Sequence, residues 1–167
     1  MAASEVELMT RLAELGIATT THRHAAMRTV EDSKAIRGDL PGGHCKSLFL
    51  KDKKSQVWLV VAQEDRQIDL KNLHKRIGSG RLSFAKPELM WELLGVIPGA
   101  VTPFALINDV DHQVNVVLDA AMLQLELLNY HPLHNEATTA ISANDLKRFI
   151  TAMGHSFAEI DLEAELD

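Results

Sequence analysis

The stretch CKSLFLKDKKSQVWLVVA, residues 45–62, decides the fold of this chain. Two apolar-rich segments, 45–51 and 56–62, lie on either side of the polar turn 52–55. Short apolar runs around a polar turn are typical of a β-hairpin, and this turn contributes two lysines. The sequence therefore predicts a hairpin with a lysine-bearing tip.

Helix and strand signals follow one another irregularly around this hairpin. Ser4 stands three residues before Glu7, the spacing of a capping box, and apolar residues recur at helical intervals until Gly16. Further helices are expected from residue 29, over 69–77, 86–95 and 142–153, with one helical turn over 119–122. Strands are expected over 17–24, 81–84, 125–130, 138–141 and 156–161, and a second hairpin from 104–107 and 114–118.

This order of elements predicts the fold class. Helices scattered among hairpins, without a regular strand–helix–strand alternation, favour an α+β domain with a mixed, largely antiparallel sheet or barrel-like core surrounded by helices. A doubly wound nucleotide-binding fold is not expected, because neither GxGxxG nor GxxxxGK[ST] occurs. We expect one domain over residues 1–167.

The composition limits the classes of protein to consider. The chain has 167 residues, of which 46% are hydrophobic and 24% charged, as in a globular protein. No apolar run approaches the roughly 20 residues that span a bilayer, and the start MAASEVELMT lacks the features of a signal peptide, so a cytoplasmic location is expected. The single cysteine, Cys45, excludes an internal disulfide and a cysteine-based metal site.

The net charge of −6 hides a division along the chain. Residues 34–86 carry twelve basic and five acidic side chains, a local charge of +7, whereas the remainder carries −13. This segregation predicts a basic face for a polyanion such as a nucleic acid, unless the charges interleave once the chain folds. The residues expected to contact the phosphates of such a polyanion lie on the hairpin and the following helix: Lys51, Lys53, Lys54, Lys75 and Arg76.

Lys46 interrupts an otherwise apolar strand directly after a Gly-Gly turn. A lysine in a half-buried strand either extends to water or faces a polar cavity, so Lys46 is an active-site candidate or an ordinary edge-strand lysine. Cys45 precedes it, and successive strand residues point to opposite faces. Because a single buried cysteine is usually inert, we do not expect Cys45 to act in catalysis.

A second candidate is the loop 99–103, GAVTP. Glycine lets backbone amides approach a ligand and proline holds the loop rigid, so the loop could present N–H groups to a carbonyl oxygen or a water. A purely structural turn would have the same pattern.

The third candidate is the polar segment 130–139, YHPLHNEATT, which lies between apolar strands and fits either a site or a surface loop. Pro132 separates His131 from His134 and no third ligand is indicated, so no metal is expected there. His22 and His24 would share one strand face, which is also too few ligands for a metal site.

Several segments occur together in the order typical of one family. They are RGDLPGGHCKSLFLKDKK, WLVVAQED, GRLSFAKPE, LLGVIPGAVTPFALIND, VVLDAAML and NYHPLHNEATTAIS. With these segments the chain resembles, over nearly its whole length, the YbaK-like aminoacyl-tRNA deacylases, which include the editing domain inserted into bacterial prolyl-tRNA synthetases. Within that family it is most similar to the free-standing alanyl-specific members.

The resemblance implies hydrolysis of the ester that joins a wrong amino acid, chiefly alanine, to proline tRNA. The family's catalytic lysine corresponds to Lys46, and its GxxxP loop begins at Gly99. The chain departs from its relatives at residues 24–26, His-Ala-Ala instead of His-Pro-Pro, and at residues 46–48, Lys-Ser-Leu instead of Lys-Asn-Leu. The residues implied to bind substrate are Val101, Thr102, Pro103, His131, Asn135, Thr138 and Thr139.

The chemistry of such a site needs no cofactor, metal or covalent intermediate. An aminoacyl ester is reactive, so an enzyme can hydrolyse it by placing a water against the carbonyl and stabilising the oxyanion with fixed donors. We expect backbone amides around Gly99 to position the carbonyl or the water and Lys46 to anchor the terminal adenosine or a phosphate. The ribose hydroxyl beside the ester is expected to accept a proton or hold the water.

The expected partner is the acceptor end of mischarged proline tRNA, with transient contact to prolyl-tRNA synthetase or an elongation factor and none to a membrane. Pocket volume would select alanine over proline, at about 1–3 kcal/mol per methylene-sized misfit. A deacylase that prefers cysteine, and a module that binds tRNA or a synthetase without hydrolysis, are the alternatives. Lys46 and the intact loop favour an enzyme.

Overall fold

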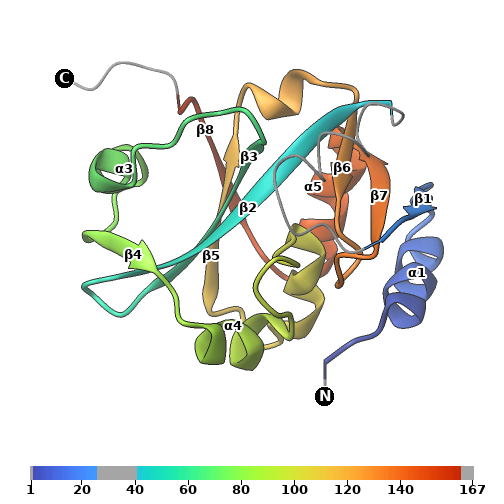
Figure 1. Cartoon of the computed structure of the whole chain (residues 1–167), viewed down its shortest axis with the longest axis horizontal. Helices are drawn as coiled ribbons and strands as arrows, with labels where there is room; N and C mark the ends of the chain where they lie inside the picture. Colours follow the sequence, from blue (N-terminus) through green and yellow to red (C-terminus); the bar gives the residue numbers. More distant parts are fainter. Residues whose placement is uncertain (1, 26–40, 163–167) are drawn as a thin grey trace.

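A computed structural model describes residues 2–25 and 41–162 (Figure 1). Within these ranges one mixed sheet has the strand order β1-β7-β6-β2-β3-β5-β8, and β4 pairs with β2. Antiparallel pairs (β1–β7, β6–β7, β2–β3, β2–β4) outnumber parallel ones (β2–β6, β3–β5, β5–β8). The strands are β1 Thr20–Arg23, β2 Gly43–Asp52, β3 Val57–Gln63, β4 Leu82–Phe84, β5 Val114–Asp119, β6 Leu127–Tyr130, β7 Ala137–Ser142 and β8 Phe157–Ile160.

The predicted hairpin is β2 and β3, which lie in the middle of the sheet and pair in register from Cys45 opposite Gln63 to Lys51 opposite Val57. Alternate residues enter two apolar clusters. Phe49 and Leu59 belong to the larger cluster, and Leu50 and Val60 to the smaller one. Because this part of the sheet is covered on both faces, its strands are nearly continuously apolar.

The helices begin where the sequence predicts. They are α1 Glu5–Glu14, α3 Leu70–Ile77, α4 Pro87–Leu94 and α5 Ala143–Ala152. The side chains of Ser4, Asp69 and Ser142 each accept a backbone N–H of the first turn, which confirms the three predicted caps. The larger cluster packs against α1, α4 and α5, and the smaller one against α3. The helix expected from residue 29 lies outside the described residues.

One predicted element is wrong. Residues 104–107 form no strand, because Pro103–Asn108 is a short 3-10 helix, η1, and β5 pairs parallel to β3 rather than in a second hairpin. Pro103 sets the first turn of η1, and the Thr102 hydroxyl accepts the Phe104 N–H at 3.3 Å. The buried Asp109 carboxylate then accepts the N–H groups of Gln113 and Val114, which turns the chain into β5. The helical turn expected over 119–122 lies slightly later, at η2, Met122–Gln124.

The confirmed fold class is therefore α+β, with helices around a mixed sheet. In the described ranges, no helix combines the length and the apolar character that crossing a membrane requires.

Candidate active site

Four neighbouring strands bring most of the predicted site residues to one end of the sheet, at the upper right of Figure 1. The start of β2 lies beside the end of β6, with His44 opposite Asn129. The end of β6 lies beside β7, with Tyr130 opposite Thr139, and β7 lies beside β1, with Thr138 opposite His22. Lys46, His131 and Thr138 therefore converge although they are far apart in sequence, whereas the Thr139 side chain points to the other face of β7, the face of Tyr130.

The side chain of Lys46 donates a hydrogen bond from Nζ to the carbonyl oxygen of Arg66, in the turn after β3. Burial lowers the pKa of the Lys46 ammonium, and the nearby charges of Glu64 and Asp65 oppose this effect. An ammonium group has three donors, so Lys46 can bind an anionic or carbonyl group of a ligand as well as Arg66.

A buried ion pair fixes the carbonyl that Lys46 contacts. Arg66 Nε donates to Asp119 Oδ2 at 2.7 Å, and the two side chains are 8% and 0% exposed. Sequence analysis did not identify these two residues. The signal for Asp119 was its position as a charged residue that directly follows the apolar run of β5.

Cys45 points to the other side of β2 and packs against the larger apolar cluster. Its thiol donates to the Gly43 carbonyl at 3.8 Å. Burial raises the pKa of Cys45 to about 12, despite a hydrogen bond with Tyr130 that lowers it. A thiol in this environment stays protonated, which agrees with the prediction that Cys45 is not a nucleophile.

The Gly99–Pro103 loop has backbone donors that are available to a ligand. Gly99 is exposed and has φ +92°, a conformation that favours glycine. Within the described residues, the N–H groups of Gly99 and Val101 have no hydrogen-bond partner. Thr102 and Pro103 are buried, and Thr102 caps η1, so these two side chains support the loop.

The loop lies against the segment between β6 and β7. A Cβ atom placed on Gly99 would be 3.5 Å from Asn135 Nδ2, in ordinary van der Waals contact. The side-chain amide of Asn135 therefore lies beside Gly99. No hydrogen bond in the described part of the chain joins this loop to Lys46.

His131 is the histidine of this segment that faces the predicted site. Its Nδ1 lies 3.2 Å from the carbonyl of Ala137. Burial lowers the pKa of His131, with His24 and His134 adding to this effect and the Ala137 carbonyl and Glu64 opposing it. A neutral ring that donates from Nδ1 leaves Nε2 as an acceptor. Glu64 acts electrostatically on both Lys46 and His131, which links the two sides of the site.

The two threonines have different partners. Thr138 Oγ1 lies 2.8 Å from His24 Nε2, and Thr139 Oγ1 lies 2.8 Å from Thr21 Oγ1. Thr139 is fully buried, so its hydroxyl mainly ties β7 to β1. The contact with Thr138 adds His24 to the site. Sequence analysis noted this residue as a histidine of the first strand and in the departure at residues 24–26, and did not assign it to the site.

His134 anchors the segment instead of binding a ligand. Its Nε2 lies 2.6 Å from Glu5 Oε1, and its Nδ1 accepts the Glu136 N–H at 3.1 Å. Glu5 also pairs with Arg23, whose hydrogen bond lowers the pKa of Glu5. In the described ranges no three His, Cys, Asp or Glu side chains gather as a metal site.

The basic residues gather at the opposite end of β2, at the left of Figure 1. Lys53 N donates to the Arg81 carbonyl at 3.1 Å, and the adjacent Gly80 N donates to Asp52 at 3.1 Å. These contacts bring the hairpin tip against the turn that follows α3, which carries Lys75 and Arg76. Lys51, Lys53, Lys54 and Lys75 are exposed. Lys34 and Arg37 of the basic stretch lie outside the described residues.

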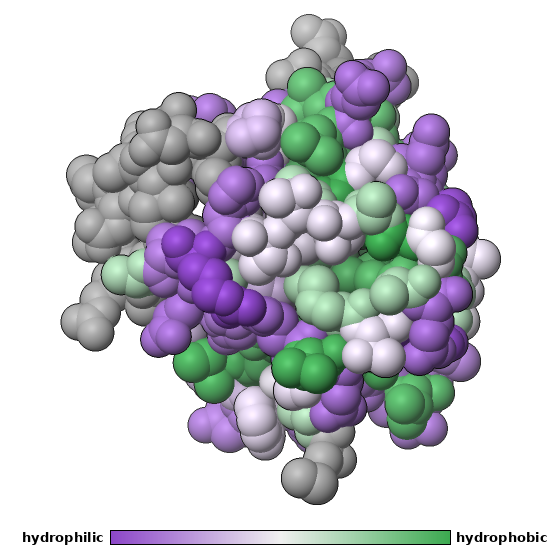
Figure 2. All heavy atoms as spheres, turned by 90° about the vertical axis from the view of Figure 1, so that its right-hand side faces the viewer, coloured by the Kyte–Doolittle hydropathy of each residue, from purple (hydrophilic) through white to green (hydrophobic). Residues whose placement is uncertain are grey.

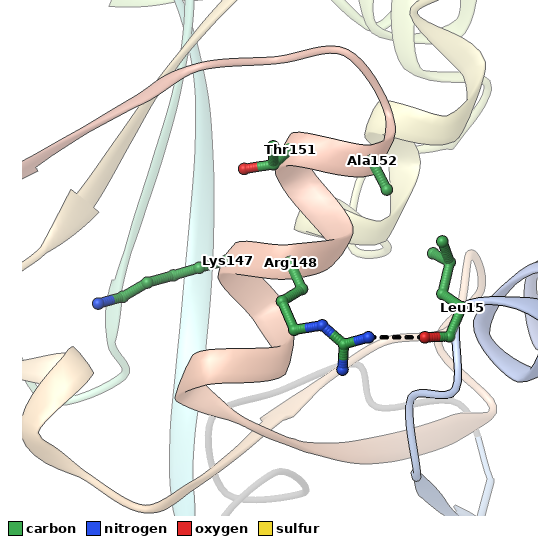
Figure 3. Close-up of a pocket in the computed structure, with 5 residues that line it drawn as sticks. All are labelled: Leu15, Lys147, Arg148, Thr151 and Ala152. Carbon is green, nitrogen blue, oxygen red and sulfur yellow. Dashed lines mark hydrogen bonds between the residues drawn. The ribbon is translucent and has the colours of Figure 1, made fainter.

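A different surface lies on the right-hand side of Figure 1, opposite the hairpin tip. Figure 2 shows hydrophobic and weakly polar residues around a shallow hollow, with hydrophilic residues mainly toward the rim. A groove of about 440 Å³ lies between the end of α1 and α5, lined by Leu15, Lys147, Arg148, Thr151 and Ala152. Arg148 Nη2 donates to the Leu15 carbonyl at 2.7 Å across it (Figure 3). The groove contains none of the predicted site residues.

Comparison with known proteins agrees with this arrangement. Residues 24–149 match the aminoacyl-tRNA editing domain family. Prolyl-tRNA synthetase associated domain-containing protein 1 of Mus musculus is 43% identical over 162 residues, which cover 93% of this chain and 95% of the relative. Prolyl-tRNA editing protein ProX of Acetoanaerobium sticklandii is 37% identical over 156 residues, with coverage of 93% and 95%.

Two other proteins extend the comparison. Multifunctional Ser/Thr-tRNA deacylase ProXp-y of Escherichia coli K12 is 36% identical over 85 residues, which cover 49% of this chain and 51% of the relative. A crystal structure described as a candidate trans-editing enzyme for prolyl-tRNA synthetase has the same fold, with a TM-score of 0.70 at 20% identity and coverage of 96% and 99%.

The fold, the site and these matches define the class of protein: an aminoacyl-tRNA deacylase of the editing type. The chain belongs to the aminoacyl-tRNA editing domain family, which confirms the YbaK-like resemblance.

Proposed function

We propose that this protein hydrolyses the ester of alanine mischarged onto proline tRNA and releases alanine and free tRNA. The Gly99 loop carries this proposal. Among the described residues its N–H groups at Gly99 and Val101 have no acceptor, and Gly99 lies beside Asn135. Free backbone donors of this kind can hold a carbonyl oxygen or a water, as ester hydrolysis requires. Relatives named as a prolyl-tRNA editing protein and a prolyl-tRNA synthetase associated protein support the choice of tRNA.

In this proposal Lys46 anchors the terminal adenosine or a phosphate and adds positive charge near the oxyanion. The ion pair between Arg66 and Asp119 fixes the position of the Arg66 carbonyl, and the hydrogen bond to this carbonyl orients the Lys46 ammonium. His131 and Asn135 contribute hydrogen bonds to the aminoacyl-adenosine, and the side chains of residues 101–103 hold the loop in shape. The substrate-binding assignments of His131 and Thr138 rest on their convergence beside β2, and that of Asn135 on its position beside Gly99. The assignment of Thr139 rests on the family resemblance alone.

The tRNA would lie along β2, with its acceptor end at Lys46 and its phosphates at the basic hairpin tip. Lys46 and Asp52 are six residues apart, about 20 Å along a strand at about 3.3 Å per residue. Lys51, Lys53, Lys54, Lys75 and Arg76 are the residues proposed to contact phosphates. The names of the relatives favour the synthetase, rather than an elongation factor, as an additional transient partner.

A second candidate is a deacylase with a different amino-acid preference, such as cysteine or serine. The Escherichia coli relative that is named a Ser/Thr-tRNA deacylase favours testing serine directly. A module that binds tRNA without hydrolysis is the third.

The experiment that separates these candidates is deacylation of purified proline tRNA charged in turn with Ala, Cys, Ser and Pro. We expect the fastest hydrolysis with Ala, and Pro to be spared. Faster release of Cys or Ser would reassign the substrate. Binding of all four tRNAs without hydrolysis of any would identify a binding module.

A further inference from the structure

A carboxylate that the proposed mechanism does not use lies beside Lys46. Glu64 directly follows β3, and its N–H donates to the His44 carbonyl at 2.8 Å, so the pairing of β2 with β3 continues to this residue. Residues opposite one another in a sheet point to the same face, and so do alternate residues of one strand. Glu64, His44 and Lys46 therefore share one face of the sheet.

Glu64 is close enough to Lys46 for their charges to interact. Lys46 lies opposite Ala62, so Glu64 is its diagonal neighbour across the two strands, a separation of about 7–8 Å that long side chains can bridge. Burial lowers the pKa of Lys46, and the Glu64 charge opposes this effect. Because both residues are half-buried, salt screens their interaction less than it screens a surface pair.

His131 lies on the other side of Lys46. β6 runs parallel to β2 with Asn129 opposite His44, and the same register continued by two residues puts His131 beside Lys46. Burial lowers the pKa of His131, and the charge of Glu64 opposes this effect too. The Glu64 carboxylate thus acts on groups from two neighbouring elements of the site.

His131 also connects this carboxylate with the Gly99 loop. The Nδ1 atom of His131 lies 3.2 Å from the Ala137 carbonyl, and Asn135 is two residues before Ala137, at most about 7 Å away along the chain. A Cβ atom on Gly99 would lie 3.5 Å from Asn135 Nδ2. The loop donors, the imidazole and the carboxylate are therefore parts of one polar site.

Resting on the hydrolytic function proposed above, we propose that Glu64 binds the α-ammonium group of the aminoacyl ester. The ester carries this positive group on the carbon next to the carbonyl, so a site that holds the carbonyl also meets the ammonium. The positive charge of Lys46 repels the ammonium, and a carboxylate on the same face of the sheet offsets that repulsion. Glu64 is then a specificity-determining residue, and the substrate class is esters with a free α-amine.

The position of Glu64 distinguishes it from the neighbouring carboxylate. Asp65 is exposed and its charge acts on Lys46, whereas Glu64 is half-buried and its charge acts on His131 as well. An ionised carboxylate accepts several hydrogen bonds at its two oxygens, so Glu64 can bind the ammonium while it keeps partners within the chain. Because an amide nitrogen carries no positive charge, N-acylated aminoacyl-tRNA and peptidyl-tRNA are spared.

The test compares two proline tRNAs that differ in one group of the ester. One carries alanine and the other lactate, in which a neutral hydroxyl of nearly the same size replaces the α-ammonium. Single-turnover hydrolysis of each is measured with the parent, Glu64→Gln, Glu64→Asp and the control Asp65→Asn. Every rate is divided by the uncatalysed rate of the same ester, and circular dichroism checks the folding of each variant.

We expect the parent to accelerate hydrolysis of the alanyl ester about 10- to 100-fold more than that of the lactyl ester, the contribution of a hydrogen bond to a charged group. Glu64→Gln should lose most of this preference, because its rate falls with the alanyl ester and stays within about threefold of the parent with the lactyl ester. Glu64→Asp should keep part of the preference, and Asp65→Asn should keep all of it.

The ratio between the two esters separates recognition from a structural role, since a distorted site slows both esters alike. Equal acceleration of both esters by the parent would overturn the ammonium subsite and leave the proposed hydrolysis intact. An unchanged preference in folded Glu64→Gln, or in Glu64→Asp should Glu64→Gln not fold, would remove Glu64 from the subsite. A parent that hydrolyses neither ester would instead overturn the proposed function.

Discussion

Lys46 and Asp52 lie on the same strand, β2. The surroundings of Asp52 stabilise its charged form, whereas those of Lys46 destabilise the charged form. Asp52 accepts four hydrogen bonds, from the N–H groups of Lys54, Gln56 and Gly80 and from Trp58 Nε1. Burial alone would raise the pKa of Asp52, but these four donors lower it below its ordinary value. Among the described residues Lys46 makes one hydrogen bond, to the Arg66 carbonyl, and burial lowers its pKa.

The difference separates a charge that serves the fold from one that serves a site. The Asp52 carboxylate is stabilised by donors from the turn 53–56, from β3 and from the turn before β4, so it holds the hairpin tip together. The Lys46 ammonium is kept in a less favourable environment and retains donors for a ligand. Perturbed and incompletely bonded charges of this kind are more common at functional sites than in structural networks.

The largest expected effect is at the Lys46 end. Lys46→Ala should lower the rate of Ala-tRNA hydrolysis by about 100-fold or more, the loss typical of removing a fixed electrostatic donor. The fold should survive, because Lys46 is not part of either apolar cluster. Single-turnover assays and thermal unfolding measure the two quantities, and Lys86→Ala, at an exposed position before α4, is the control. Parent-like hydrolysis by folded Lys46→Ala would remove Lys46 from the mechanism.

At the Asp52 end the effect should fall on stability. Asp52→Ala removes the acceptor of four part-buried hydrogen bonds, which should cost about 2–6 kcal/mol of unfolding free energy at about 0.5–1.5 kcal/mol per bond. Urea unfolding measures this, with Asp111→Ala in an exposed turn as the control. Activity per folded molecule should stay at the parent level. A variant as stable as the parent would show that the four hydrogen bonds contribute little.

The lowered pKa of Asp52 predicts that the free energy of unfolding depends on pH. Because the pKa of Asp52 is lower in the folded chain than in the unfolded one, its contribution is fully present above the unfolded pKa and is lost as pH falls through the folded pKa. The stability difference between parent and Asp52→Asn should therefore shrink on acidification from neutral pH. If the stability difference between the parent and Asp52→Asn does not change on acidification, the ionised Asp52 carboxylate does not stabilise the fold.

A smaller effect is expected on tRNA binding by the basic tip. Replacing Lys53, Lys54, Lys75 and Arg76 by Ala should weaken binding of correctly and incorrectly charged tRNA alike. Each lost phosphate contact should flatten the slope of log K against log salt by about 0.7–0.9. Discrimination between Ala and Pro should stay unchanged, because the site lies at the other end of β2. Replacing Lys147 and Arg148 on α5 by Ala is the control. Equal salt slopes for the fourfold variant and this control would contradict binding of tRNA phosphates at the hairpin tip.

The smallest effect should come from Cys45, the neighbour of Lys46 on the opposite face. Cys45→Ser should retain nearly all activity, since a thiol with a pKa of about 12 supplies almost no thiolate at neutral pH. Alkylation by iodoacetamide should likewise be slow in the folded chain. A folded but inactive Cys45→Ser would require a nucleophilic thiol and overturn the comparison of the two strand faces.

Local signals in the sequence determined much of this protein. The hairpin of β2 and β3 and the caps at Ser4, Asp69 and Ser142 depend on residues within a few positions of each other, so spacing alone predicts them. Lys46 was identifiable because a lysine in an apolar strand is conspicuous, and the Gly99 loop because glycine and proline shape the backbone.

Only the tertiary structure decided which polar groups meet. Arg66 and Asp119 are 53 residues apart and His24 and Thr138 are 114 apart, and no local pattern encodes such contacts. Residues 104–107 have the composition of a strand, yet the Thr102 cap and Pro103 start a 3-10 helix there, and β5 finds its partner in the parallel direction beside β3. Strand pairing and burial are fixed by the free energy of the whole packed chain, so local propensity is overruled wherever distant residues supply the partner.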